Sequence, residues 1–175
     1  LHSWAQSGDL VQREDGLYEA SEEALNRPAK TTAELWGERV ATLPEPLRPA
    51  AMAAAALGGD IRRDVLRVLL SALGLDANRA ISAMKRAQML LPSGTDRLRW
   101  THALLQEYLL QELVEQDSAH DVFRAASNAL AHHPAASSGR IVRHRVTNLL
   151  RAGDTEHAAE LLHAHVAASW SQVRD

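Results

Sequence analysis

The feature that most constrains the fold is a series of apolar stripes with helical spacing, each set between a capping residue and a glycine or proline. Over residues 60–74, apolar side chains recur every three or four positions between Asp60 and Gly74. This spacing places them on one face of an α-helix, while aspartate favours a helix start and glycine a helix end. The same plan returns over 76–91, which begins at Asp76. We therefore expect a mainly helical protein.

Further helices are expected before and after this pair. Thr31 or Thr32 would cap the first of them, and Pro44 and Pro46 would stop it. Thr101 would cap the long helix that follows the pair. The additional helices are expected over residues 31–43, 47–59, 101–115, 118–133, 139–152 and 154–169. The second of these is rich in alanine, so a neighbouring helix could approach it closely.

Short extended segments are expected at two places. Asp15 and Gly16 lie between two short extended runs within 9–21, and Asp-Gly in that position is a strong hairpin signal. The run "RLRW" over 97–100 alternates charged and apolar residues, which indicates a short strand. The β content is therefore expected to be small.

Composition excludes several classes of protein. The 175 residues are 46% hydrophobic, enough for one or two small cores, and the formal net charge is -3, which argues against a dedicated nucleic-acid binder. The absence of cysteine excludes disulfides and thiolate catalysis.

No apolar run approaches the ~20 residues that span a bilayer, and the start lacks a signal peptide. We expect a cytoplasmic protein without membrane contact, and a piece of a longer chain, because the sequence starts in mid-pattern.

Motifs for chemistry within the chain are missing. Nine histidines invite a metal site, but no HExxH run is present, and His157, His163 and His165 lack metal-ligand spacing. There is neither a GxSxG elbow nor a GxxxxGK[ST] phosphate loop. We therefore expect no metal site, no cofactor held by this chain alone, and no catalytic residues.

The order of helices, turn and strand over 31–116 suggests a winged-helix-like domain whose helix-turn-helix is formed by 60–73 and 76–91. If it bound DNA, polar and basic side chains would face the duplex. The candidates are Asn78, Arg79, Lys85, Arg86, Arg97 and Arg99. The short wing "PSGTD" and the net acidic charge favour a solvated helix face instead, so DNA binding stays the alternative.

The domain boundaries follow from these patterns. Residues 1–30 would end a preceding lid-like helical region and carry the hairpin. Residues 31–116 would form the winged-helix-like domain, and residues 117–175 would begin an array of antiparallel helical pairs. At most one and a half units of a roughly 34-residue period are present, and a free-standing array needs about three.

The series over 9–116 resembles the region that follows the ATPase domain in bacterial STAND proteins, which are signalling ATPases related to the AAA+ fold. The resemblance rests on "L..R...LP...R...AAA.LGG.I" and on "LRWTHALLQEYL". It implies an upstream domain that binds ATP or ADP with Mg²⁺, often beside a protein kinase, a nucleotide cyclase or a LuxR-type regulator. It also implies tetratricopeptide-like repeats downstream, which "RVTNLLRAGDTEHAAELLHAHV" resembles.

The same resemblance implies a role for His102. "THALLQEYL" is similar to the Met-His-Asp motif of related immune receptors, with Thr101 and Ala103 in place of the outer two residues. His102 would contact the ADP phosphate of the upstream domain. A histidine at a helix N-terminus suits this task, because free N–H groups and the helix dipole favour a phosphate. The alternative is a purely structural role, in which His102 packs at a strand-to-helix corner.

We therefore expect a non-catalytic regulatory segment that relays the nucleotide state of an upstream ATPase, in cis, to a protein partner bound by the helical repeats. The alternatives are a DNA-binding winged helix from a transcription regulator and a scaffold that is indifferent to nucleotide.

Overall fold

The computed structural model describes residues 10–12, 18–20 and 31–171, and side chains over 31–170. The chain divides into two compact units, Leu1–Leu35 and Trp36–Asp175. In the first unit, β1 (Leu10–Gln12) pairs antiparallel with β2 (Tyr18–Ala20). The expected hairpin strands are therefore confirmed, while its turn residues, Asp15 and Gly16, lie outside the described residues.

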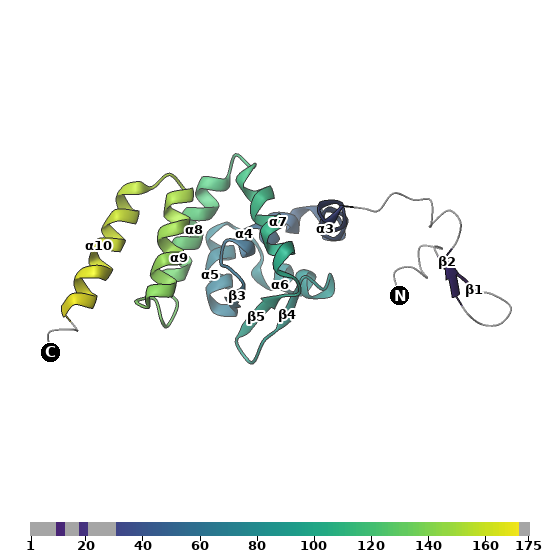
Figure 1. Cartoon of the computed structure of the whole chain (residues 1–175), viewed down its shortest axis with the longest axis horizontal. Coiled ribbons are helices and arrows are strands. Elements are labelled where there is room, and N and C mark those ends of the chain that lie inside the picture. Colours follow the sequence, from purple (N-terminus) through teal and green to yellow (C-terminus); the bar gives the residue numbers. More distant parts are fainter. Residues whose placement is uncertain (1–9, 13–17, 21–30, 172–175) are drawn as a thin grey trace. The chain divides into compact units, whose positions relative to one another are not determined.

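Helix α3 (Thr32–Ala41), labelled in Figure 1, begins with a reciprocal cap. The Glu34 backbone N–H donates to Thr31 Oγ1 at 3.2 Å, and the Thr31 backbone N–H donates to Glu34 Oε2 at 2.6 Å. This capping box satisfies two N–H groups that a helix start otherwise leaves free. Of the two expected capping residues, Thr31 is the one used.

The core of the second unit is built around an alanine-rich helix, α4 (Arg48–Ala55), which follows a single 3-10 turn, η1 (Glu45–Leu47). The alanines from 53 to 56 are completely buried. The helix packs against α5, α6, α7 and α8, because alanine lets neighbouring backbones come close. The expected helix over 47–59 is confirmed but ends earlier, at Ala55.

A three-stranded antiparallel sheet lies beside these helices. It consists of β3 (Asp60–Arg62), β4 (Leu90–Pro92) and β5 (Arg97–Trp100), with β5 in the centre. Ile61 lies opposite Leu98 and Leu90 opposite Trp100, and all four side chains are buried. The strand expected at "RLRW" is therefore confirmed, and its alternating pattern sets which face is buried.

Two helix boundaries differ from the prediction. Asp60 does not cap a helix; it lies in β3 and forms an ion pair with Arg97 of β5, so α5 (Arg63–Ala72) begins three residues later than expected. The second helix, α6 (Ala77–Arg86), does begin at the expected cap, where Asp76 accepts the Arg79 N–H at 3.0 Å.

Helix α6 ends five residues before the predicted position because Gln88 adopts a left-handed conformation with φ of 53°. Its N–H donates to the Lys85 carbonyl, and the Met89 N–H donates to the Met84 carbonyl. These two bonds form a Schellman motif, in which glycine is the usual left-handed residue. Leu90 and Leu91 then enter β4 instead of continuing the helix.

Helix α7 (Ala103–Val114) is preceded by His102, which occupies the N-cap position without a side-chain capping bond. The predicted cap, Thr101, instead donates its hydroxyl to the Met89 carbonyl at 3.2 Å. Leu105 and Leu109 are fully buried, but Leu104, also expected inside, is 56% exposed.

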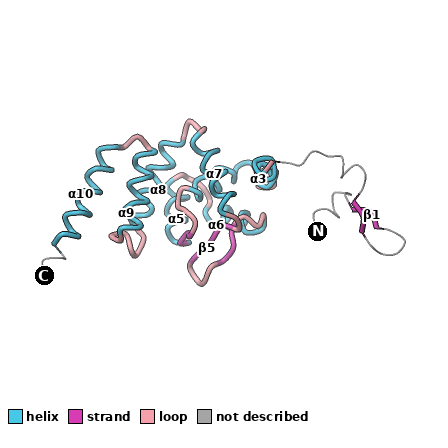
Figure 2. Tube along the Cα trace, in the orientation of Figure 1, coloured by secondary structure: helices cyan, strands magenta, loops and turns pink. Residues whose placement is uncertain are grey.

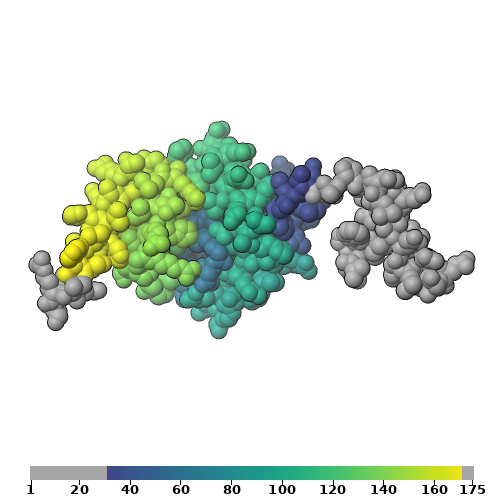
Figure 3. Space-filling model, viewed as in Figure 1, coloured from purple at the N-terminus to yellow at the C-terminus, as the bar shows by residue number. Residues whose placement is uncertain are grey.

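Three helices form the C-terminal part, which we call the tail: α8 (Ala119–Ala131), α9 (Gly139–Arg151) and α10 (Thr155–Ser171). Helix α9 packs between α8 and α10, as Figures 1 and 2 show. The predicted ranges are confirmed within two residues. Leu162 and Val166 of α10, the helix at the yellow end in Figure 3, are half exposed, although the sequence pattern predicts both to be buried.

The tail is joined to the core at the C-terminal end of α4. Three side chains donate hydrogen bonds to carbonyls there: Gln106 Nε2 to Ala55 at 3.2 Å, Asn148 Nδ2 to Ala56 at 3.0 Å, and Trp100 Nε1 to Gly58 at 3.0 Å. The donors come from α7, α9 and β5. Helix ends carry carbonyls without intrahelical partners, so these bonds help to satisfy them, together with the Gly58 N–H, which also donates to the Ala55 carbonyl.

The loop after α4 also makes a close contact with the tail. Gly58 has φ of 93°, and a Cβ built there would lie 2.7 Å from Cε1 of His144 on α9. Both the backbone conformation and the space therefore require glycine at this position.

No helix over the described ranges 10–12, 18–20 and 31–171 is both long enough and apolar enough to cross a membrane.

The junction predicts the effect of one substitution. Asn148 is completely buried, and Asn148→Ala would remove its hydrogen bond to the buried Ala56 carbonyl. We expect the free energy of unfolding to fall by about 1–3 kcal/mol, measured by chemical denaturation. The control is Asn128→Ala on the exposed side of α8, which should change stability by less than about 0.5 kcal/mol. Equal effects of the two variants would contradict the role given to this bond.

Candidate functional site

His102 lies against the ring of Trp36 at the start of α7. The ring centroids are 5.2 Å apart and the planes are tilted by 36°. The guanidinium of Arg39 lies 5.9 Å from the Trp36 ring centroid on α3. The imidazole is exposed, and it neither caps the helix nor pairs with a carboxylate among the residues that the structure describes. His102 therefore packs against Trp36, and its imidazole is still exposed to solvent.

The candidate DNA-contacting residues form two groups. Asn78, Arg79, Lys85 and Arg86 are all exposed on α6, and positions seven apart lie on the same side of a helix. No residue within α6 is acidic. The Asn78 side-chain oxygen accepts a bond from Arg67 Nη2 of α5 at 3.4 Å, which adds a further cation to this surface.

The second group lies on β5. Arg97 and Arg99 alternate with the buried Leu98 and Trp100, so both project to the solvent side of the sheet. Arg97 is already paired with Asp60, whereas Arg99 has no ion pair within the described segments. The structure therefore assembles a basic face on α6 but leaves only Arg99 of the β5 pair free.

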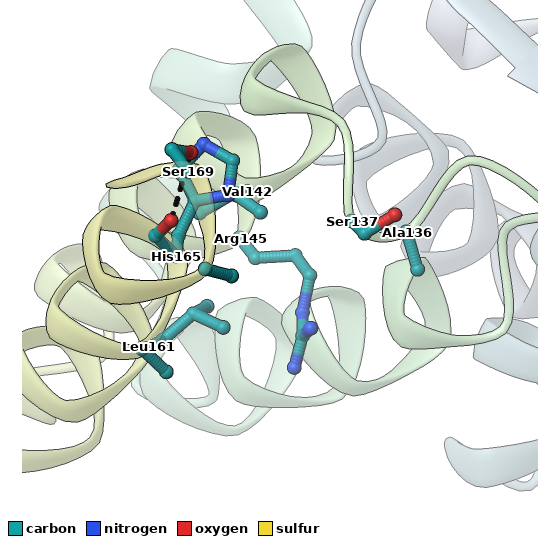
Figure 4. A pocket seen from close by; sticks show the side chains of 9 residues that line it. Ala136, Ser137, Val142, Arg145, Leu161, His165 and Ser169 are labelled. Carbon is teal, nitrogen blue, oxygen red and sulfur yellow. Dashed lines mark hydrogen bonds between the residues drawn. The ribbon is translucent and has the colours of Figure 1, made fainter. Parts of the chain in front are cut away.

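A groove of about 460 Å³ lies between α9, α10 and the α8–α9 loop; we call it the tail groove. Figure 4 shows Arg145 projecting into it between Leu161 of α10 and Ala136 of the loop. The remaining lining residues are Ser137, Val142, Ala164, His165, Ala168 and Ser169. The groove thus combines an apolar floor with a few polar groups.

Arg145 is the strongest polar feature of the tail groove. Its Nε donates to the Ser127 carbonyl of α8 at 3.2 Å, and desolvation by burial lowers the pKa of the guanidinium. None of the ion pairs formed by the described residues includes it. A half-buried arginine without a carboxylate is costly, and an incoming carboxylate would remove much of that cost.

The sequence analysis missed Arg145, although a signal was present. Val142 and Leu149 are buried, and Arg145 lies three residues after the first and four before the second. A cation at a position of this kind belongs to the packed face of the helix. Arg145 is the charged residue that interrupts the apolar stripe of α9.

No metal centre is assembled: across residues 10–12, 18–20 and 31–171, no three side chains of histidine, cysteine, aspartate or glutamate lie close enough to hold an ion. His157, one of the histidines considered above, is instead paired with Asp154, with Nδ1 2.7 Å from Oδ1. This pairing raises the pKa of His157 and lowers that of Asp154.

Comparisons with protein-family models, with curated proteins and with solved structures found no match to the chain.

Proposed function

We propose that the chain is a non-catalytic regulatory and interaction segment of a STAND-type signalling ATPase. In this proposal an upstream domain binds ATP or ADP with Mg²⁺, the region 31–116 is a winged-helix-like domain, and the tail begins a tetratricopeptide-like array that binds a protein partner in the cytoplasm. The proposal draws on the sequence resemblance, on the fold and on the junction between core and tail.

The order of elements supports the winged-helix assignment. Helix α4 is followed by β3, the pair α5 and α6, and then the hairpin of β4 and β5, with the strands ordered β3-β5-β4. A helix-turn-helix closed by a three-stranded sheet is the arrangement expected of such a domain. The tail supports the second assignment, because its helices pack antiparallel with short connections.

The observation that carries the relay mechanism is the buried bond from Asn148 to the Ala56 carbonyl. Together with the packing of α8 against α5, it joins α9 to the helix at the centre of the core, so we expect core and tail to move as one body. A change in how the core docks on an upstream domain would therefore reposition the partner-binding tail. The mechanism is a population shift between a docked and a released state, biased by nucleotide.

The tail groove supports the choice of partner. Its half-buried Arg145 pairs with no carboxylate of the residues that the structure describes, and its lining includes Val142 and Leu161. An extended peptide with an acidic side chain next to an apolar one would satisfy both features. We therefore assign the groove to an acidic segment of a protein partner.

A specific observation also favours a second function. Helix α6 presents Asn78, Arg79, Lys85 and Arg86 to solvent without any acidic residue of its own. Such a face could lie in a major groove, with Arg99 of the sheet near a phosphate. DNA binding therefore remains the alternative to the relay.

The tail groove can be tested with a labelled peptide of alternating glutamate and leucine. We expect Arg145→Gln to weaken binding about tenfold, because one charge-assisted contact is lost. Arg143→Gln is the matched control, since Arg143 is exposed on the same helix and outside the groove. Fluorescence anisotropy measures both. An equal loss of peptide affinity in the two variants would show that the peptide is attracted only by the overall positive charge of α9.

The role implied for His102 is tested in a protein that carries the ATPase domain ahead of this segment. His102→Ala should speed ADP release and raise basal output, because a contact that holds the closed state is removed. His120→Ala is the control, since His120 is exposed on α8. Stopped-flow release of a fluorescent ADP gives the rate. Release at the wild-type rate from the His102 variant would remove the sensor role and leave only packing on Trp36.

The DNA alternative makes an electrostatic prediction. If α6 contacts the backbone, random duplex DNA should bind at low salt, and affinity should fall as salt rises, with a smaller salt slope for Lys85→Gln. Anisotropy titrations at several salt concentrations measure the slope. No binding at low salt would discard this function, whereas binding with the predicted slope would favour it over the relay.

A further inference from the structure

A second cavity, of about 450 Å³, lies where the three-stranded sheet meets the α8–α9 loop; we call it the junction cavity. Its walls come from both the core and the tail. The charged and imidazole side chains that line it are Asp60, Arg62, Arg97, His133, Arg140 and His144. Three arginines thus surround one cavity, with one carboxylate among the lining residues.

Three carboxylates lie near these arginines: Asp60, Asp64 and, beside Arg62, Asp96. Asp60 pairs with Arg97, and Asp64 accepts from Arg62 through both oxygens, at 3.0 and 2.7 Å. Arg140 has neither an ion pair nor a side-chain hydrogen bond with any of the described residues. Arg140 is therefore without a carboxylate partner among the described residues, and the guanidinium of Arg97 keeps N–H groups that Asp60 does not occupy.

His133 provides a further donor. Its Nδ1 accepts the backbone N–H of Ala135 at 3.0 Å, so the neutral ring carries its proton on Nε2. No described residue accepts a bond from that Nε2–H. The loop that forms this bond connects α8 to α9, so the imidazole is held in place by the backbone beside the cavity.

The surroundings of both histidines are electropositive. Burial lowers the pKa of His133, and Arg62 and Arg97 lower it further, against a smaller opposing effect of Asp64 and Asp60. Burial likewise lowers the pKa of His144, with additional contributions from Arg151 and Arg140, while the Ala56 carbonyl opposes them. The arginines that disfavour protonation of these two imidazoles would attract an anion to the same region.

We propose that the junction cavity binds a small phosphate monoester, whose phosphoryl group is held by Arg97, His133 and Arg140. Donors from a strand, a loop and a helix suit a tetrahedral dianion better than a flat carboxylate, and arginine is well matched to phosphate. The apolar lining, which includes Leu57, Ile61 and Ile141, would hold the organic part. The volume falls in the range of small-molecule sites.

Bound there, the ligand contacts the sheet of the core and the first turn of α9 together. It therefore bridges core and tail without altering how they are joined, and its binding requires no nucleotide upstream. This site is separate from the tail groove, because Arg145 and His165 do not line it. The proposal consequently survives or fails on its own.

The test uses phenyl phosphate, inorganic phosphate and phenol as probes, titrated into the whole chain at constant ionic strength and followed by NMR. We expect phenyl phosphate to bind with a Kd of about 1 mM or tighter, inorganic phosphate more weakly, and phenol not at all. The largest shifts should fall on residues 133–141. Arg140→Gln should weaken phenyl phosphate about tenfold.

Arg143→Gln is the matched control, because it removes the same charge from α9 outside the junction cavity. It should leave the affinity for phenyl phosphate within about twofold. Far-UV circular dichroism confirms that both variants keep their helices. The proposal is overturned by an absence of shifts at about 10 mM phenyl phosphate, by equal losses in the two variants, or by phenol binding as well as its phosphate ester.

Discussion

The structure depends on the way the C-terminal end of α4 is satisfied. The C-terminal end of this alanine-rich helix can be buried only if the carbonyls there find donors, and Trp100, Gln106 and Asn148 contribute three. One donor comes from the sheet, one from α7 and one from the tail. The elements around α4 are therefore arranged by polar contacts as well as by apolar packing.

Local signals in the sequence were sufficient for most of the helices. Asp76 caps α6 as predicted, and Gly74 and Gly153 adopt the left-handed conformation that ends α5 and α9. The three tail helices were placed within two residues of their positions. Capping and terminating residues act over a few positions, so they can be recognised in a single sequence without knowledge of the fold.

Elements that need a distant partner could not be placed in the same way. Residue Asp60 reads as a helix cap, but it pairs with Arg97, 37 residues later, and the strand exists only because β5 is beside it. The early end of α6 has a different cause, because Gln88 takes a conformation that its side chain does not favour. The packing of the core outweighs local preference there.

The same distinction applies to the candidate sites. The exposed polar face of α6 is a property of one helix, so Asn78 and Arg79 could be named from the sequence. Arg145 could have been found from its position among Val142 and Leu149, but the groove beside it requires α10. His133 and Arg140 gain meaning only from a cavity shared with β3 and β5, which no local pattern describes.

The bare backbone at Gly58 limits what the contact between core and tail can accept. A positive φ and the absence of a side chain are both needed there for His144 to pack against the loop. A side chain at residue 58 would therefore strain the turn and displace the imidazole. The close approach of α9 to the loop between α4 and β3 thus depends on a residue that contributes no side chain of its own.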